Sequence, residues 1–138
     1  MKIAILCLLT ILFTAISALH FFWLFGGRWG LEAALPRRDG DSRLFEPGKI
    51  ATLIVSLGLI LLNLACFNYM TLLGEQLPYT RNILLIFSAI FALRFIGEFN
   101  YVGFFSRKRP TSFHYWDIRL HSPLSLLLGS LLFALASI

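Results

Sequence analysis

The sequence feature that most constrains the fold is a set of four long apolar runs separated by short polar segments. The runs cover about residues 3–25, 50–74, 82–106 and 120–138. A helix that crosses a bilayer needs about 20 predominantly apolar residues. The run lengths therefore predict a single all-α domain over residues 1–138, an integral membrane four-helix bundle.

The composition agrees with a membrane environment and excludes several classes of protein. Hydrophobic residues make up 58% of the chain and charged residues 14%, whereas soluble domains average about 45–50% and about 25%. A disordered chain and a soluble enzyme of this size are therefore excluded. The net charge is +5, but almost all of the basic residues lie between the apolar runs, where membrane topology requires them. We therefore expect no nucleic-acid partner.

The first and last runs each have a second interpretation. Residues 3–25 follow Lys2 and contain a small-residue stretch at 15–18, as a signal peptide would. The apolar stretch then continues to Phe25, which is too long for a typical signal, so we favour a retained helix. The last run has only 16 residues from Pro123 to Ile138. A start one turn earlier, near Ile118, would bring it closer to a full span.

The distribution of basic residues predicts the orientation in the membrane. Four spans put both termini on one side, with only Lys2 and Arg81. Nine basic residues lie on the other side: Arg28, Arg37, Arg38, Arg43, Lys49, Arg107, Lys108, Arg109 and Arg119. The positive-inside rule then places both termini outside the cell and loops 26–49 and 107–121 in the cytoplasm. The lipid bilayer is the first expected partner, and the sequence leaves the oligomeric state open.

Two charged residues lie inside the third run. Arg94 is near its middle, and Glu98 follows one helical turn later. A charge at the bilayer centre costs about 2.5–3.5 kcal/mol even on insertion scales, so we expect neither side chain to face lipid. One interpretation is an internal Arg94–Glu98 ion pair that fixes helix packing. The other is a polar pocket that binds an anionic or polar head group through Arg94. The Ser, Thr and Gly positions on each helix predict close packing seams.

Further polar and aromatic residues are predicted at the same depth. His20, at the cytoplasmic end of the first helix, matches the level of Glu98 and Tyr101. The candidate ligand-binding residues are His20, Trp23, Trp29, Arg94, Glu98, Tyr101 and Asp117. His114 and His121 do not have metal-ligand spacing, and no phosphate-binding loop or dinucleotide fingerprint occurs. We therefore expect no metal and no cofactor.

Several sequence blocks resemble a family of small bacterial four-helix membrane proteins of unknown function. The blocks are HFFW at 20–23, GGRWG at 26–30, Pro36, PG at 47–48, RFIGEFNYVGFF at 94–105 and DIRLHSPL at 117–124. The resemblance covers nearly the whole chain. It implies four spans in a bacterial inner membrane, and it implies no activity.

Three function classes remain open on the sequence. The first is a module that binds or transports a lipid-like or amphipathic small molecule at the polar pocket. The second is a membrane-embedded enzyme that uses Glu98 or His20 as acid or base on an apolar substrate, with Asp117 as the nearest second carboxylate. The third is a structural or accessory subunit in which Arg94 and Glu98 hold the assembly together.

Overall fold

The computed structural model describes residues 1–36, 48–72, 75–107 and 111–138. Its elements are α1 (Lys2–Leu24), α2 (Leu31–Ala34), α3 (Lys49–Tyr69), α4 (Thr80–Ile96), α5 (Ser112–Trp116), the π-helical segment η1 (Asp117–His121) and α6 (Ser122–Ser137). No strand occurs in these ranges. The predicted all-α fold is therefore confirmed.

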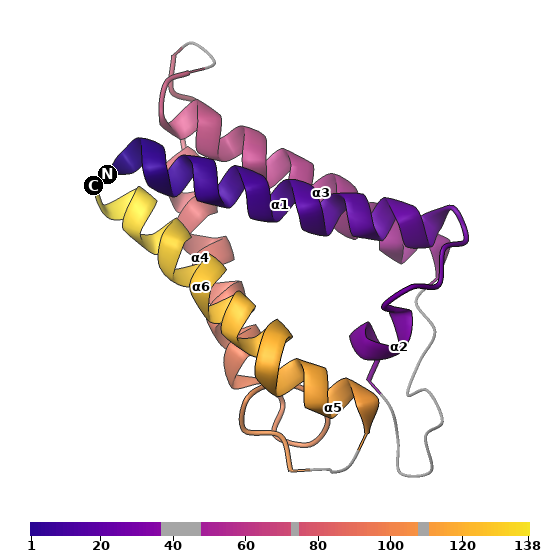
Figure 1. The fold of residues 1–138 in the computed structure, drawn as a ribbon. Helices are drawn as coiled ribbons and strands as arrows, with labels where there is room; N and C mark the ends of the chain where they lie inside the picture. Colours follow the sequence, from indigo (N-terminus) through magenta and orange to yellow (C-terminus); the bar gives the residue numbers. More distant parts are fainter. Residues whose placement is uncertain (37–47, 73–74, 108–110) are drawn as a thin grey trace.

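The four long helices form two pairs. Helix α1 packs mainly against α3, and α4 packs mainly against α6. Figure 1 shows the pairs close together at the end that carries both termini and diverging toward the opposite end, where α2 contacts α5. We refer to these two ends as the terminal half and the α2–α5 half.

Small polar residues line the seam within each pair, as the sequence predicts. Ser17 of α1 donates a hydrogen bond to the Ser56 carbonyl of α3 at 2.9 Å. In the other pair, Ser88 of α4 donates to the Gly129 carbonyl of α6 at 2.8 Å. A Cβ atom at Gly129 would lie 3.0 Å from the Ser88 carbonyl oxygen, so a residue with no side chain allows this close approach.

The apolar core joins all four long helices, but only in the terminal half. Its fully or nearly fully buried members are Leu6, Leu9, Phe13, Leu62, Cys66, Leu84, Leu128, Leu132, Leu135 and Ala136. Toward the α2–α5 half, the last residues packed against this core are Ile16, Leu59, Phe91 and Leu124. Helices α1 and α3 continue for eight to ten further residues beyond these positions. Each pair is therefore built mostly from its own contacts in the α2–α5 half.

Two of the predicted spans end earlier than expected. Helix α3 ends at Tyr69 instead of residue 74, because Asn68 turns the chain toward α4. Its side-chain oxygen accepts hydrogen bonds from the Leu77 N–H and the Thr80 hydroxyl. Helix α4 ends at Ile96 instead of residue 106, because Gly97 adopts a positive φ of 77°. Arg94 consequently lies in the last turn of α4 instead of the middle of a longer helix.

The fourth span is longer than predicted. The helix is continuous from Ser112 to Ser137, 26 residues, so most of the predicted loop 107–121 is helical. Pro123 lacks an N–H, and its ring crowds the carbonyl one turn earlier in a regular α-helix. The π-helical turn η1 immediately precedes it and widens the backbone there. The chain therefore accommodates the proline within one helix.

Among the residues that the structure describes, three helices are long and apolar enough to cross a membrane: Lys2–Leu24, Lys49–Tyr69 and Ser112–Ser137. Helix α4 has 17 residues and a length of about 26 Å. It lies along α6 (Figure 1).

Candidate functional site

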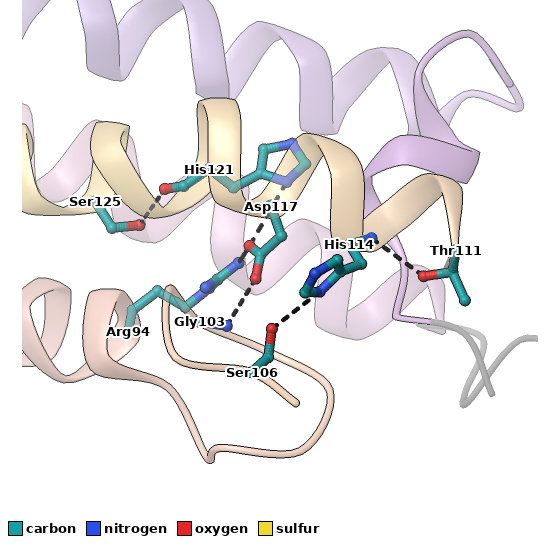
Figure 2. Close-up of polar contacts among 8 residues, drawn as sticks. All are labelled: Arg94, Gly103, Ser106, Thr111, His114, Asp117, His121 and Ser125. Atoms are coloured by element: carbon teal, nitrogen blue, oxygen red, sulfur yellow. Dashed lines mark hydrogen bonds and ion pairs between the residues drawn. The ribbon is translucent and has the colours of Figure 1, made fainter. Parts of the chain in front are cut away.

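A buried ion pair joins the end of α4 to the π-helical segment (Figure 2). Nη2 of Arg94 lies 2.6 Å from Oδ1 of Asp117. The Asp117 side chain is completely buried, whereas 32% of the Arg94 side chain is exposed. The second carboxylate oxygen, Oδ2, accepts a hydrogen bond of 2.7 Å from the Gly103 N–H. Both oxygens of the buried carboxylate are therefore satisfied, as a buried charge requires.

Two glycines shape the loop that supplies the Gly103 N–H. Both Gly97 and Gly103 have positive φ, and their backbones are in contact. A Cβ atom at Gly97 would lie 1.9 Å from the Val102 carbonyl oxygen, and one at Gly103 would lie 2.4 Å from the Gly97 Cα. Only glycine fits both positions. The Phe104 N–H then bonds the Phe95 carbonyl at 2.8 Å, which holds the loop against the end of α4.

Histidines flank Asp117 on the same continuous helix. Nδ1 of His121 lies 3.9 Å from Oδ1 of Asp117. His114, one turn before Asp117, lies 3.1 Å from the Ser106 hydroxyl through its Nδ1, and both of these residues are buried. The Thr111 hydroxyl accepts a hydrogen bond from the His114 N–H and caps α5. The 97–107 loop is thus fastened to the helix at two points, Asp117 and His114 (Figure 2).

The predicted partner of Arg94 is wrong. Glu98 lies beyond the end of α4 and is exposed, and its carboxylate accepts a hydrogen bond from the Tyr101 N–H. The Arg94–Glu98 pair assumed one continuous helix, in which residues four apart share a face. Because Gly97 ends the helix, Arg94 pairs instead with Asp117, 23 residues away.

Three other candidate residues form a separate group at the end of α1. Nε1 of Trp23 donates to the Trp29 carbonyl at 2.8 Å. The His20 ring lies edge-on to Trp23, with 5.1 Å between ring centroids, and its Nδ1 lies 2.8 Å from the Ile16 carbonyl. His20, Glu98 and Asp117 thus have different partners. The contacts thus join His20 and Trp29 to Trp23, Arg94 to Asp117, and Glu98 to Tyr101.

An open groove runs between α1 and α3. Its volume is about 290 Å³, and its lining includes Phe13, Ser17 and Ala18 of α1 together with Leu59 and Asn63 of α3. Phe13 also stacks on Phe91 of α4, with 6.3 Å between ring centroids. Phe91 precedes Arg94 by one helical turn. The groove is thus connected to the α4–α6 pair through one aromatic contact.

The sequence did not identify Gly103, Ser106 and His114 as members of the polar cluster around Arg94 and Asp117. The six-residue spacing between Gly97 and Gly103 was the available signal, since paired glycines mark close backbone contact. No local sequence pattern predicts the π-helical turn. The turn depends on how the folded helix accommodates Asp117 and Pro123. Within the described ranges, no group of three His, Cys, Asp or Glu residues has an arrangement suited to a metal ion.

The Arg94–Asp117 site joins two of the sequence blocks on which the family resemblance is based. Arg94, Gly97 and Gly103 come from block 94–105, and Asp117 comes from block 117–124. A family model described as "Protein of unknown function (DUF3995)" matches residues 13–132. The chain belongs to the DUF3995 family. This match covers both the 97–107 loop and the π-helical segment. No curated protein matches the chain, and no solved structure does.

Proposed function

We propose that this DUF3995 chain is a multi-pass protein of the bacterial inner membrane that binds a lipid-like, amphipathic small molecule. The hydrocarbon part lies in the groove between α1 and α3, and the polar part lies toward Arg94. Both termini are outside the cell, and the α2–α5 half faces the cytoplasm.

The aromatic and basic residues of the α2–α5 half support the membrane part of this proposal. Exposed aromatic side chains there include Phe25, Trp29, Phe104, Phe105, Tyr115 and Trp116. The Arg119 guanidinium carbon lies 3.9 Å from the centre of the Tyr115 ring. Aromatic and basic side chains together are typical of a cytoplasmic membrane interface. The predicted orientation also depends on five basic residues that lie outside the described residues: Arg37, Arg38, Arg43, Lys108 and Arg109.

The main observation that supports ligand binding is the groove at the edge of the four-helix core. Phe13 and Leu59 line it at the level where the core ends. Its lining is mostly apolar, with Thr14, Ser17 and Asn63 as polar members, as expected of a site for an amphiphile. Arg94, one turn beyond Phe91, has a side chain that is about one-third exposed. An apolar groove beside a polar group matches a molecule with a hydrocarbon chain and a polar end.

Native mass spectrometry on gently extracted protein tests this proposal. We expect the wild type to carry a defined adduct that organic solvent extracts. Ala18→Phe places a ring in the groove and removes no hydrogen bond, because Ala18 is an exposed lining residue. The variant should lose the adduct. Ala15→Phe is the matched control, since Ala15 is exposed on the same helix and is not a lining residue.

Two results would overturn the ligand-binding proposal. One is a wild-type protein that carries no adduct and binds no added lipid in a saturable manner. The other is equal adduct loss in Ala18→Phe and Ala15→Phe. Loss of a partner subunit in place of a small molecule would favour an accessory role.

The orientation has its own test. A fluorescent reporter that is active only in the cytoplasm, fused after Ile138, should give no signal. The same reporter inserted in the 37–47 segment should be active. A fluorescent C-terminal fusion would reverse the proposed orientation without affecting the ligand proposal.

A further inference from the structure

Two side-chain hydrogen bonds join α1 to α3 along the groove between them. The Ser17 hydroxyl donates to the Ser56 carbonyl at 2.9 Å, and the Thr10 hydroxyl donates to Oδ1 of Asn63 at 3.2 Å. These two contacts are about two turns apart along each helix. Thr14, which lies between them on α1, lines the groove. The groove therefore has polar side chains on both of its helices.

The amide of Asn63 has a donor group that the protein does not use. Its Oδ1 is bonded to Thr10, which is not a lining residue, whereas Asn63 itself lines the groove. Within the described ranges, its Nδ2 has no hydrogen-bond partner. The buried side-chain atoms without a partner in those ranges are Nη1 of Arg94 and Oγ of Ser122. Nδ2 of Asn63 is not one of them, so it is accessible from outside the protein.

Both polar lining residues lie well inside their helices. Asn63 lies about 9 Å from the end of α3 at Tyr69, and Thr14 lies about 15 Å from the end of α1 at Leu24. In the membrane of the proposed function, whose hydrocarbon core is about 30 Å thick, this is the depth of the acyl chains. Bulk water does not reach that depth, and a saturated acyl chain has no acceptor. The Asn63 amide therefore favours a lipid that carries an oxygen within its apolar part.

The chemistry of the lining restricts that oxygen. Among the described residues, none that lines the groove is charged, so a carboxylate or phosphate would lose its hydration without gaining a counter-charge. A carbonyl oxygen is uncharged, has two lone pairs and brings no hydrogen of its own. It can accept from Nδ2 of Asn63 and from the hydroxyl of Thr14. A keto group thus fits the donors that this groove offers.

We propose that Asn63 binds a carbonyl oxygen on the apolar part of the amphiphile, with the Thr14 hydroxyl as the second donor. This inference rests on the proposed function and narrows its ligand class. The polar end still lies toward Arg94, and the groove adds recognition of an oxygen within the chain. The ligand is therefore a lipid whose hydrocarbon part carries a keto group.

The test compares two fatty acids of equal length. Stearic acid and 10-oxostearic acid are titrated separately onto the delipidated full chain in detergent and followed by native mass spectrometry. They differ in one keto group near the middle of the chain, as Thr14 lies near the middle of α1. We expect the wild type to bind 10-oxostearic acid about tenfold more tightly, which corresponds to about one hydrogen bond.

Asn63→Leu tests whether the amide causes this preference. The variant replaces the amide with an apolar side chain of similar size, so the preference should fall to about twofold or less while stearic acid still binds. A purely structural role would weaken both fatty acids equally and leave their ratio unchanged.

Ser56→Ala is the matched control on α3. The Ser56 hydroxyl donates to the Thr52 and Leu53 carbonyls of its own helix, and Ser56 is not a lining residue. The Ser56 carbonyl that accepts from Ser17 remains in the variant. Its preference for 10-oxostearic acid should therefore stay at about tenfold.

Equal binding of the two fatty acids by the wild type would overturn this inference, and so would a preference that Asn63→Leu does not reduce. In either case, saturable binding of stearic acid that Ala18→Phe abolishes would leave the proposed function intact. If neither fatty acid binds saturably, the inference fails, and the adduct on the gently extracted wild type then decides the proposed function.

Discussion

The terminal half and the α2–α5 half are held together by different forces. In the terminal half, residues such as Leu9, Leu84 and Leu132 have no exposed surface and join all four long helices. In the α2–α5 half, the buried residues are mainly polar, with Ser106, His114, Asp117 and Ser122 among them. The first half depends on shape complementarity, and the second depends on directed hydrogen bonds and on the Arg94–Asp117 ion pair.

This difference indicates where the molecule has room for function. Lipid tails are as apolar as leucine, so apolar packing between membrane helices yields stability mainly through close contact. Polar groups that are buried inside a protein must find partners, because burial removes their hydrogen bonds to water. The room for a ligand lies where the apolar packing ends, at the groove between α1 and α3.

The largest expected effect comes from removing the buried carboxylate. Asp117→Ala leaves the Arg94 guanidinium and the Gly103 N–H without an acceptor. The free energy of unfolding should fall by about 3–5 kcal/mol, as for other broken buried pairs. Unfolding of the purified protein in increasing SDS, followed by circular dichroism, measures this loss.

The neutral double variant Arg94→Gln with Asp117→Asn sharpens that result. It removes both charges and keeps a donor and an acceptor in place, so it should recover most of the lost stability. Glu98→Gln should change stability by less than about 0.5 kcal/mol, because Glu98 is exposed. If Glu98→Gln lost as much unfolding free energy as Asp117→Ala, the result would support the predicted Arg94–Glu98 pair.

The next largest effect tests the apolar core of the terminal half. Leu132→Ala removes a completely buried side chain on α6 and should cost about 2–5 kcal/mol of unfolding free energy. Leu126, on the same helix, is 43% exposed, and Leu126→Ala should cost less than about 1 kcal/mol. SDS unfolding of the two variants side by side makes the comparison. Equal losses would mean that the four-helix core does not exist as described.

The smallest effect concerns the seam between α4 and α6. Ser88→Ala removes the hydrogen bond to the Gly129 carbonyl and should cost about 0.6 kcal/mol, the average for such bonds between membrane helices. Ser130→Ala, at an exposed position beside Gly129, should have no measurable effect. A Ser88→Ala loss above about 2 kcal/mol would show that hydrogen bonds also dominate the stability of this seam.

Much of the fold was predictable from local sequence, and the details of the site were not. The apolar runs predicted α1 within one residue at each end, since its bounds depend only on a long uncharged stretch. The end of α4 was missed because Gly97 stops the helix by contacting Gly103, and a scan of hydropathy does not register backbone contacts. The start of the last helix was missed because Pro123 indicates a helix start, whereas the π-helical turn carries the helix past it.

The sequence by itself determined the all-α fold, the approximate helices and the family. These properties depend on composition and on the order of neighbouring residues. Only the tertiary structure decided that Arg94 pairs with Asp117, that Gly103 completes the carboxylate's hydrogen bonds, and that Ser122 is left without a partner. The physical reason is that a buried charge needs a partner of opposite charge, and the folded chain determines which one lies close enough. Here that carboxylate is 23 residues away instead of one turn along the helix.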